Sequence, residues 1–80
     1  MGYVIVEFDE RREVLVEGRS EGYNRWLNGD YRTLFIGNGL QTFRLAGNLD
    51  FEPDPNQVEV LADSTMVNPQ RIVFTKKAQT

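Results

Sequence analysis

The sequence contains no cysteine and no histidine. Without cysteine there is no disulfide, no thiol nucleophile and no thiolate ligand for a metal. Without histidine the chain lacks the usual general base near neutral pH, the imidazole metal ligand and the simple pH switch. The two serines, Ser20 and Ser64, therefore have no ordinary activating partner. These absences predict a protein that is not an enzyme and that needs no cofactor.

Long hydrophobic runs and concentrated positive charge are also missing. The longest apolar stretch near the start covers residues 3–6 and is followed by Glu7, so it is too short for a membrane span or a signal peptide. The net charge is −3, and the arginines are scattered among acidic residues. Nucleic-acid binders usually concentrate positive charge on one face, so this pattern argues against nucleic acid as a partner. We expect a small soluble domain without membrane insertion, in a compartment that the sequence leaves open.

Apolar and polar residues alternate along most of the chain, which is the pattern of half-buried strands. The alternation covers residues 3–8, 13–17, 31–36, 40–45, 57–61 and 70–75, with a weaker segment at 21–24. Apolar residues that share one face within a segment are Val4, Val6, Phe8, Val14, Val16, Leu34, Ile36, Phe43, Leu45, Val58, Val60, Ile72 and Phe74. No segment has a helical pattern.

About six or seven short strands in so short a chain predict an all-β fold, a small antiparallel β-sandwich. We expect residues 1–80 to form a single domain that ends in a short polar tail at residues 76–80. The strongest hairpin signal lies at residues 37–39, because Asn38-Gly39 suits the two positive-φ positions of a type I′ turn. Pro53 and Pro55 rule out regular strand pairing across residues 52–56 and predict a loop or an edge crossing there.

One stretch of the chain resembles the PEGA-type domain. The resemblance lies in the apolar strand and acid-Gly turn of residues 12–18, a second glycine at Gly22, and the Gly-Leu-Gln-Thr-Phe-Arg-Leu strand of residues 39–45. Residues 51–53 fall where that family has a loop with an aromatic residue, and residues 58–60 fall where it has its next strand. The resemblance implies a small β-sandwich that serves as a non-catalytic accessory domain on larger, often surface-associated, bacterial proteins. It implies no particular ligand.

Residues 23–31 bring two tyrosines, the only tryptophan and an arginine together in a predicted loop. We take Tyr23, Arg25, Trp26 and Tyr31 as a candidate binding surface, because loops on sheets often carry binding residues and these residue types dominate interface hot spots. In the other interpretation Trp26 and Leu27 fold inward and cap one end of a thin core. The usual burial of tryptophan slightly favours that cap.

Two further groups of residues need an interpretation. The carboxylates of Asp50, Glu52 and Asp54 are of the kind that bind calcium, but the segment lacks the glycine and the closing glutamate of an EF-hand loop. We therefore expect a solvated loop there and no metal site.

Opposite the predicted core, Tyr3, Ile5 and Phe35 would form an apolar stripe if exposed. Such a stripe would favour self-association or docking. The alternative is that both faces of those strands are buried.

Together these observations predict a non-catalytic accessory or interaction module that binds a protein partner or associates with itself. One alternative is a carbohydrate-binding module in which Tyr23, Trp26 and Tyr31 form a stacking platform. The other is a purely structural spacer, in which Trp26 would be buried.

Overall fold

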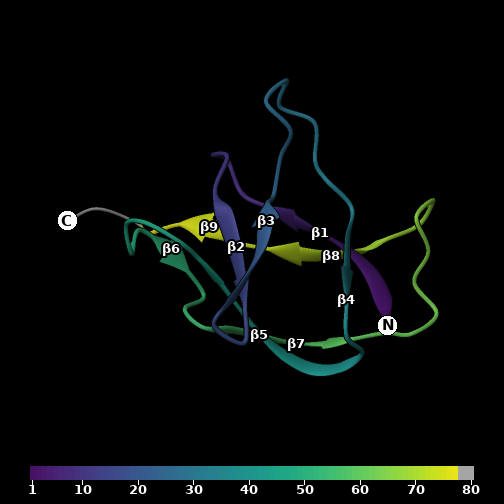
Figure 1. Cartoon of the computed structure of the whole chain (residues 1–80). Helices are drawn as coiled ribbons and strands as arrows, with labels where there is room; N and C mark the ends of the chain where they lie inside the picture. The colour runs from purple at the N-terminus through teal and green to yellow at the C-terminus, as the bar shows by residue number, and fades with distance from the viewer. Residues whose placement is uncertain (78–80) are drawn as a thin grey trace.

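The computed structural model describes residues 1–77, and in that range it contains strands and no helix (Figure 1). The all-β fold class is therefore confirmed. The strands are β1 (Gly2–Glu7), β2 (Glu13–Val16), β3 (Arg19–Tyr23), β4 (Leu34–Ile36), β5 (Gly39–Leu45), β6 (Phe51–Glu52), β7 (Asn56–Val60), β8 (Gln70–Val73) and β9 (Thr75–Lys76). Every predicted strand segment, including the weak one at residues 21–24, contains or overlaps a strand of the structure.

The strands form a three-stranded sheet in the order β4-β1-β8, a four-stranded sheet in the order β3-β2-β5-β7, and a small sheet of β6 and β9. All pairings are antiparallel except that of β1 with β8, which is parallel. This parallel pair departs from the purely antiparallel arrangement that we expected. A parallel pair needs a long crossover connection, and here most of the chain lies between its two strands.

The prediction of a hairpin at residues 37–39 is wrong. Strand β4 pairs with β1, whereas β5 pairs with β2 and β7, so the turn carries the chain from one sheet to the other. Gly39 has a φ of 94°, but Asn38 has no positive φ, so the type I′ geometry is absent as well. Residues 9–12 likewise carry the chain from one sheet to the other, because they connect β1 to β2.

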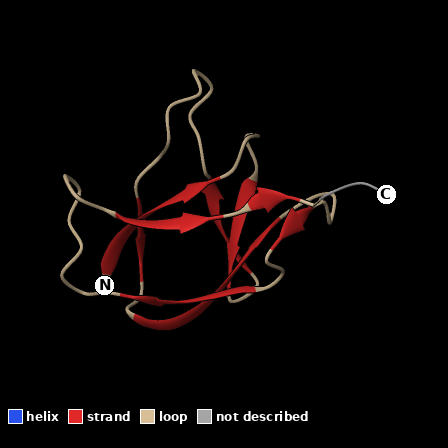
Figure 2. Cartoon of the chain, turned by 180° about the vertical axis from the view of Figure 1, so that it is seen from behind, coloured by secondary structure: helices blue, strands red, loops and turns tan. Residues whose placement is uncertain are grey.

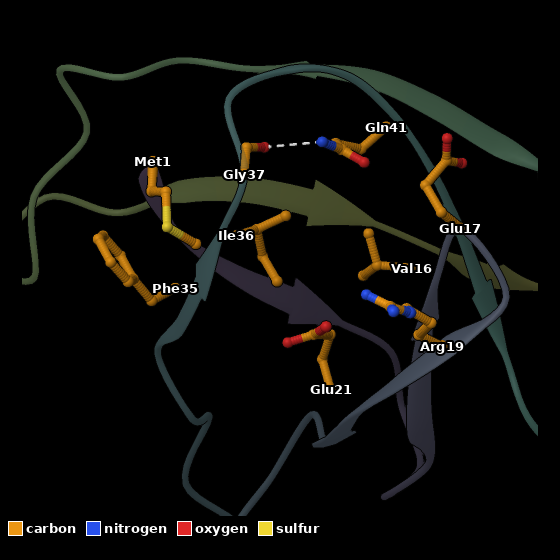
Figure 3. A pocket seen from close by; sticks show the side chains of 9 residues that line it. All are labelled: Met1, Val16, Glu17, Arg19, Glu21, Phe35, Ile36, Gly37 and Gln41. Atoms are coloured by element: carbon orange, nitrogen blue, oxygen red, sulfur yellow. Dashed lines mark hydrogen bonds between the residues drawn. The ribbon is translucent and has the colours of Figure 1, made fainter.

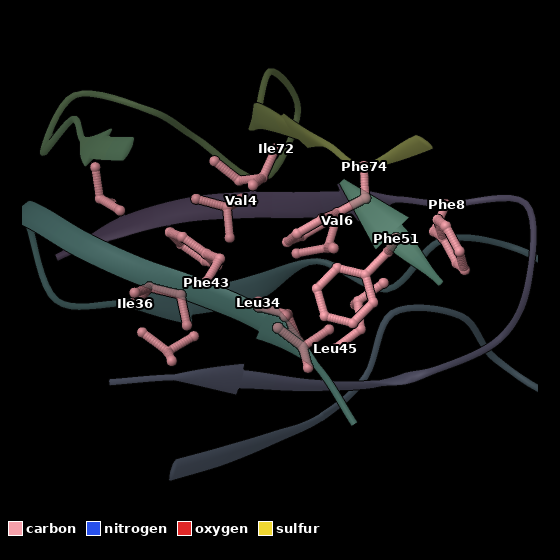
Figure 4. Packing of buried hydrophobic residues seen from close by; sticks show 13 residues of the cluster. Val4, Val6, Phe8, Leu34, Ile36, Phe43, Leu45, Phe51, Ile72 and Phe74 are labelled. Atoms are coloured by element: carbon pink, nitrogen blue, oxygen red, sulfur yellow. The ribbon is translucent and has the colours of Figure 1, made fainter. Parts of the chain in front are cut away.

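All three sheets contribute side chains to one hydrophobic cluster (Figure 4). The buried members are Val4, Val6, Phe8, Val14, Val16, Leu34, Ile36, Phe43, Leu45, Phe51, Val60, Ile72 and Phe74. Every residue that the alternation aligned is among them except Val58, which packs against the cluster while partly buried. Phe51, which we placed in a loop, also belongs to the core and meets Phe74 edge to face with ring centroids 5.4 Å apart. The predicted inner faces are therefore confirmed.

One side of the molecule, between β7 and β8, is closed by side chains. The Gln70 side chain donates from Nε2 to the carbonyl of Glu59 (2.8 Å) and accepts from the N–H of Leu61 (3.0 Å). The Asn56 Nδ2 donates to the carbonyl of Val73 (3.1 Å). These bonds join the two larger sheets where no backbone ladder connects them, because both strands are sheet edges.

The first two residues of the predicted polar tail, Lys76 and Lys77, are bonded to the rest of the fold. Lys76 belongs to β9, where it pairs with Phe51, and the N–H of Lys77 donates to the carbonyl of Asp50 (2.8 Å). Residues 78–80 lie outside the described part of the chain.

Arg12 connects several loops that are far apart in sequence. Its guanidinium pairs with Glu10 (2.7 Å) and Asp50 (2.8 Å) and donates to the carbonyls of Ala46 and Asn48. Lys76 reaches the other oxygen of Glu10 at 2.7 Å. The network therefore ties the β1–β2 loop to the β5–β6 loop and to β9.

Acidification is expected to destabilise the fold through this network. The pKa of Glu10 is lowered by hydrogen bonds from Lys76 and Arg12, and the pKa of Asp50 is lowered by Arg12. Because each folded pKa lies below its unfolded value of about 4, the stabilisation is present above that pH and is lost as the pH falls through the folded pKa. We expect the melting temperature, followed by circular dichroism, to fall on acidification, and to fall less in Arg12→Gln. An Arg71→Gln variant, which removes an ion pair outside this network, should keep the wild-type pH dependence. Equal pH dependence in Arg12→Gln and wild type would contradict this role.

Candidate functional site

The connection between β3 and β4, residues 24–33, stands away from the sheets (Figures 1 and 2). We call it the aromatic loop. It contains three of the four candidate binding residues, and the fourth, Tyr23, ends β3 directly before it.

The tip of the aromatic loop is held by its own backbone. The N–H of Gly29 donates to the carbonyl of Trp26 (2.9 Å), and the N–H of Trp26 donates to the carbonyl of Asp30 (2.8 Å). Gly29 has a φ of 95°, a conformation that glycine adopts at little cost. Below this turn Arg25 and Tyr31 form a β-bridge. The tip is therefore a closed turn on a short two-stranded stem.

Arg25 attaches the stem to the body of the protein. Its Nη2 donates to the carbonyl of Phe8 (2.7 Å) and to the Tyr31 hydroxyl (2.8 Å), and its Nη1 donates to the carbonyl of Gly29 (2.7 Å). The guanidinium carbon also lies 4.1 Å from the centre of the Tyr31 ring. Both side chains are partly buried. Arg25 and Tyr31 therefore support the loop, and most of the arginine's donors are already used.

Trp26 and Leu27 are exposed, at 56% and 89% of their surfaces. The interpretation that they cap the core is wrong, because both side chains are exposed and neither belongs to the hydrophobic cluster. Leu27 occupies the second position of the turn between Trp26 and Gly29, so its side chain projects from the tip. Tyr23 is also exposed, at 39%. The outward-facing part of the candidate site is therefore Tyr23, Trp26 and Leu27.

Two arginines that the sequence did not single out lie on these aromatic rings. The guanidinium carbon of Arg11 is 3.8 Å from the centre of the Tyr23 ring, and that of Arg32 is 4.7 Å from the Trp26 ring. Such contacts are worth about 0.5–1 kcal/mol at exposed sites. Arg11 also donates to the carbonyl of Arg25 (3.2 Å) and Arg32 to that of Tyr23 (3.3 Å). Each exposed ring thus has a guanidinium against one face.

The base of the aromatic loop depends on Asn24, the buried polar residue of the described chain. Its Oδ1 accepts from the N–H of Arg12 (2.7 Å), and its Nδ2 donates to the carbonyl of Glu10 (3.1 Å). The Asn24 backbone bonds Arg12 and Arg32 as well. Asparagine next to a run of aromatic residues gave no signal of this role, because its partners are distant in sequence.

Several arginines that pair with no carboxylate of the described residues gather around the aromatic loop. Elsewhere Arg12, Arg44, Arg71 and Lys76 each pair with a carboxylate, whereas Arg19 on β3 does not in the part of the chain that the structure describes. Within residues 1–77 the arginines at the loop have no carboxylate within ion-pair distance; they are Arg11, Arg25 and Arg32. A protein of net negative charge therefore presents unpaired positive charge beside exposed aromatic and aliphatic side chains.

The other candidate residues have ordinary environments. Asp50 pairs with Arg12 and Asp54 with Arg44 (2.7 Å), and among the described residues no group of acidic side chains is arranged to hold a metal. The pKa of Asp54 is lowered by that arginine. Ser64 donates to the carbonyl of Leu61 (2.8 Å). In the part of the chain that the structure describes, no helix could cross a membrane.

The predicted apolar stripe lies on the outer face of the three-stranded sheet. Phe35 is half exposed, whereas Tyr3 and Ile5 are partly buried, and the rings of Tyr3 and Phe35 lie 4.7 Å apart. The placement of these residues opposite the core is confirmed, and the alternative that both faces are buried is wrong.

In comparisons with protein-family models, with curated proteins and with solved structures, nothing matches this chain. The resemblance to the PEGA-type domain therefore stays a prediction.

Proposed function

We propose that this chain is a non-catalytic protein-interaction module of accessory type, as the resemblance to the PEGA-type domain implies, and that the tip of the aromatic loop is its contact surface. The observation that carries the proposal is the exposure of Trp26 and Leu27 on a turn that is closed by backbone bonds and anchored by Arg25. Tryptophan, tyrosine and arginine side chains contribute most of the energy of many interfaces. A loop that is already ordered loses less conformational entropy when it binds.

The charge at the aromatic loop favours an acidic partner. Arg11 and Arg32 flank the exposed rings and have no carboxylate within ion-pair distance in the described chain. A partner with carboxylates around an apolar residue would supply the missing counter-charge while burying Trp26 and Leu27. Electrostatic attraction of this kind makes binding weaker at higher salt.

A carbohydrate is the less favoured ligand. Sugar rings stack on open aromatic faces, but Tyr23 and Trp26 each have a guanidinium on one face, and Tyr31 is engaged by Arg25. Three rings that each carry an arginine leave less open area for a stacking platform. The spacer alternative is also weakened, since it expects a buried Trp26.

Replacing Trp26 with alanine is expected to weaken binding about tenfold or more, as for a hot-spot residue. The probe is a short synthetic peptide with glutamates around a central leucine, and the measurement is NMR titration of the isotope-labelled protein. We expect shifts at residues 23–32, and none with a matched peptide that has lysine in place of glutamate. The control is Leu49→Ala, which removes an exposed leucine outside the loop and should not change binding. Because Trp26 is exposed, its loss should change the free energy of unfolding by less than about 1 kcal/mol.

Two results would contradict the proposal. If the glutamate peptide shifts residues elsewhere, or binds Trp26→Ala as tightly as wild type, the aromatic loop is not the contact surface. If oligosaccharides of glucose or N-acetylglucosamine shift residues 23–32 and the peptides do not, the carbohydrate alternative is correct.

A further inference from the structure

A pocket of about 290 Å³ opens between the edges of the two larger sheets, on the side opposite the closed β7–β8 side (Figure 3). It lies between β3, the outermost strand of one sheet, and β4, the outermost strand of the other. Val16 and Ile36 form its apolar interior, and Phe35 and Met1 line it while remaining at least half exposed. This surface is separate from the tip of the aromatic loop.

Strand β3 places charges where a core strand would place apolar side chains. Arg19 pairs with Val16, whose side chain is buried, so Arg19 lies on the inner face of its sheet. Glu21 also lines the pocket. Within residues 1–77 neither Arg19 nor Glu21 has an ion-pair partner. The open edge therefore carries one unpaired positive and one unpaired negative group, two residues apart.

Charges on the inner face of an edge strand oppose the addition of an apolar strand, because they would lose water without gaining a partner. A strand with the opposite charge at each position removes this penalty. A second copy of β3 has that pattern. In an antiparallel pair centred on Ser20, Arg19 of each copy stands opposite Glu21 of the other, and directly opposite residues share a face.

We propose that two copies of this chain associate through β3 in this register, which joins their four-stranded sheets into one. The arrangement has two-fold symmetry, so both copies make the same contacts. The added strand forms the missing wall of the pocket and covers part of Phe35 and Met1. The pairing is short, because Arg32 lies against Gly22 and bonds the carbonyl of Tyr23. A short contact gives a weak dimer that depends on concentration.

Sedimentation velocity of the full chain over a concentration series, at low salt, tests the register. We expect a monomer–dimer equilibrium for wild type. Arg19→Glu turns two attractions into two repulsions and should weaken dimerisation about tenfold or more. Glu21→Arg should do the same, and the double variant R19E/E21R should restore the wild-type dissociation constant. Lys77→Glu, the same charge change away from β3, should leave it unchanged.

Three outcomes would overturn the proposal: a wild type that stays monomeric into the millimolar range, an Arg19→Glu variant that dimerises like wild type, or a double variant that does not recover. The second outcome would point to another surface, such as the face with Tyr3 and Phe35. Circular dichroism confirms that each variant is folded. Trp26→Ala should dimerise normally, so failure here and failure of the proposed loop function are distinguishable.

Discussion

Replacing Phe43 with alanine is expected to lower the free energy of unfolding by about 3–5 kcal/mol, through lost burial and the cavity left behind. Phe43 is fully buried on β5, where it pairs with Val16 on one side and Asn56 on the other. A chain of this length has a total stability of roughly 4–12 kcal/mol. The loss therefore removes about a quarter or more of the stability at the upper end of that range, and most or all of it at the lower end. Urea titration followed by circular dichroism measures the loss.

The matched control is Phe35→Ala. Phe35 is 50% exposed on β4 and stacks on Tyr3 across the outer face of its sheet. Its removal leaves no internal cavity, so we expect a loss of less than about 1.5 kcal/mol, the upper range for an aromatic pair. Equal losses in the two variants would show that the inner and outer faces are wrongly assigned.

The strands and the inner faces could be predicted because they depend on local sequence. Side chains in a strand alternate between two faces, so residues such as Val4, Val6 and Phe8 reveal the buried face without knowledge of the partner strand. The same alternation placed Tyr3 and Phe35 on the outer face.

The pairing of the strands could not be predicted in the same way. Residues 37–39 have the composition of a hairpin turn, yet β4 pairs with β1, far away in sequence. The parallel partner of β1, strand β8, is separated from it by most of the chain. A turn sequence shows where the chain changes direction, but the packing of the whole core decides which sheet each strand joins. Phe51 was missed for the same reason, because its burial comes from a two-residue strand paired with β9.

At the candidate site the sequence identified the residues but not their roles. Arg25 and Tyr31 bond to the carbonyl of Phe8, which directly follows β1, and so support the loop. Arg11 reaches Tyr23 from the β1–β2 loop. Each of these contacts joins parts of the chain that only the fold brings together. The exposure of Trp26 also could not be read from its residue type, since tryptophan is buried on average.

Both the aromatic loop and the β1–β2 loop are fixed at one buried group, the side chain of Asn24. Its amide accepts a hydrogen bond from the N–H of Arg12 and donates one to the carbonyl of Glu10. It therefore bonds two backbone groups of a turn that has no partner strand. Arg11, which contacts Tyr23, lies between those two residues. The position of the Arg11 guanidinium on the Tyr23 ring therefore depends on Asn24.

Replacing Asn24 with alanine is expected to cost about 2–3 kcal/mol of the free energy of unfolding, because a backbone donor and a backbone acceptor lose their partner in a partly buried site. Urea titration measures this loss, and amide hydrogen exchange should show faster exchange at residues 10–12 and in the aromatic loop. The control is Asn38→Ala at an exposed asparagine, where we expect a change within about 0.5 kcal/mol. If Asn24→Ala matched Asn38→Ala in stability and left exchange unchanged, water would be replacing the amide at little cost. The aromatic loop would then be held by Arg25 alone, and Arg25→Ala would be the variant that releases it.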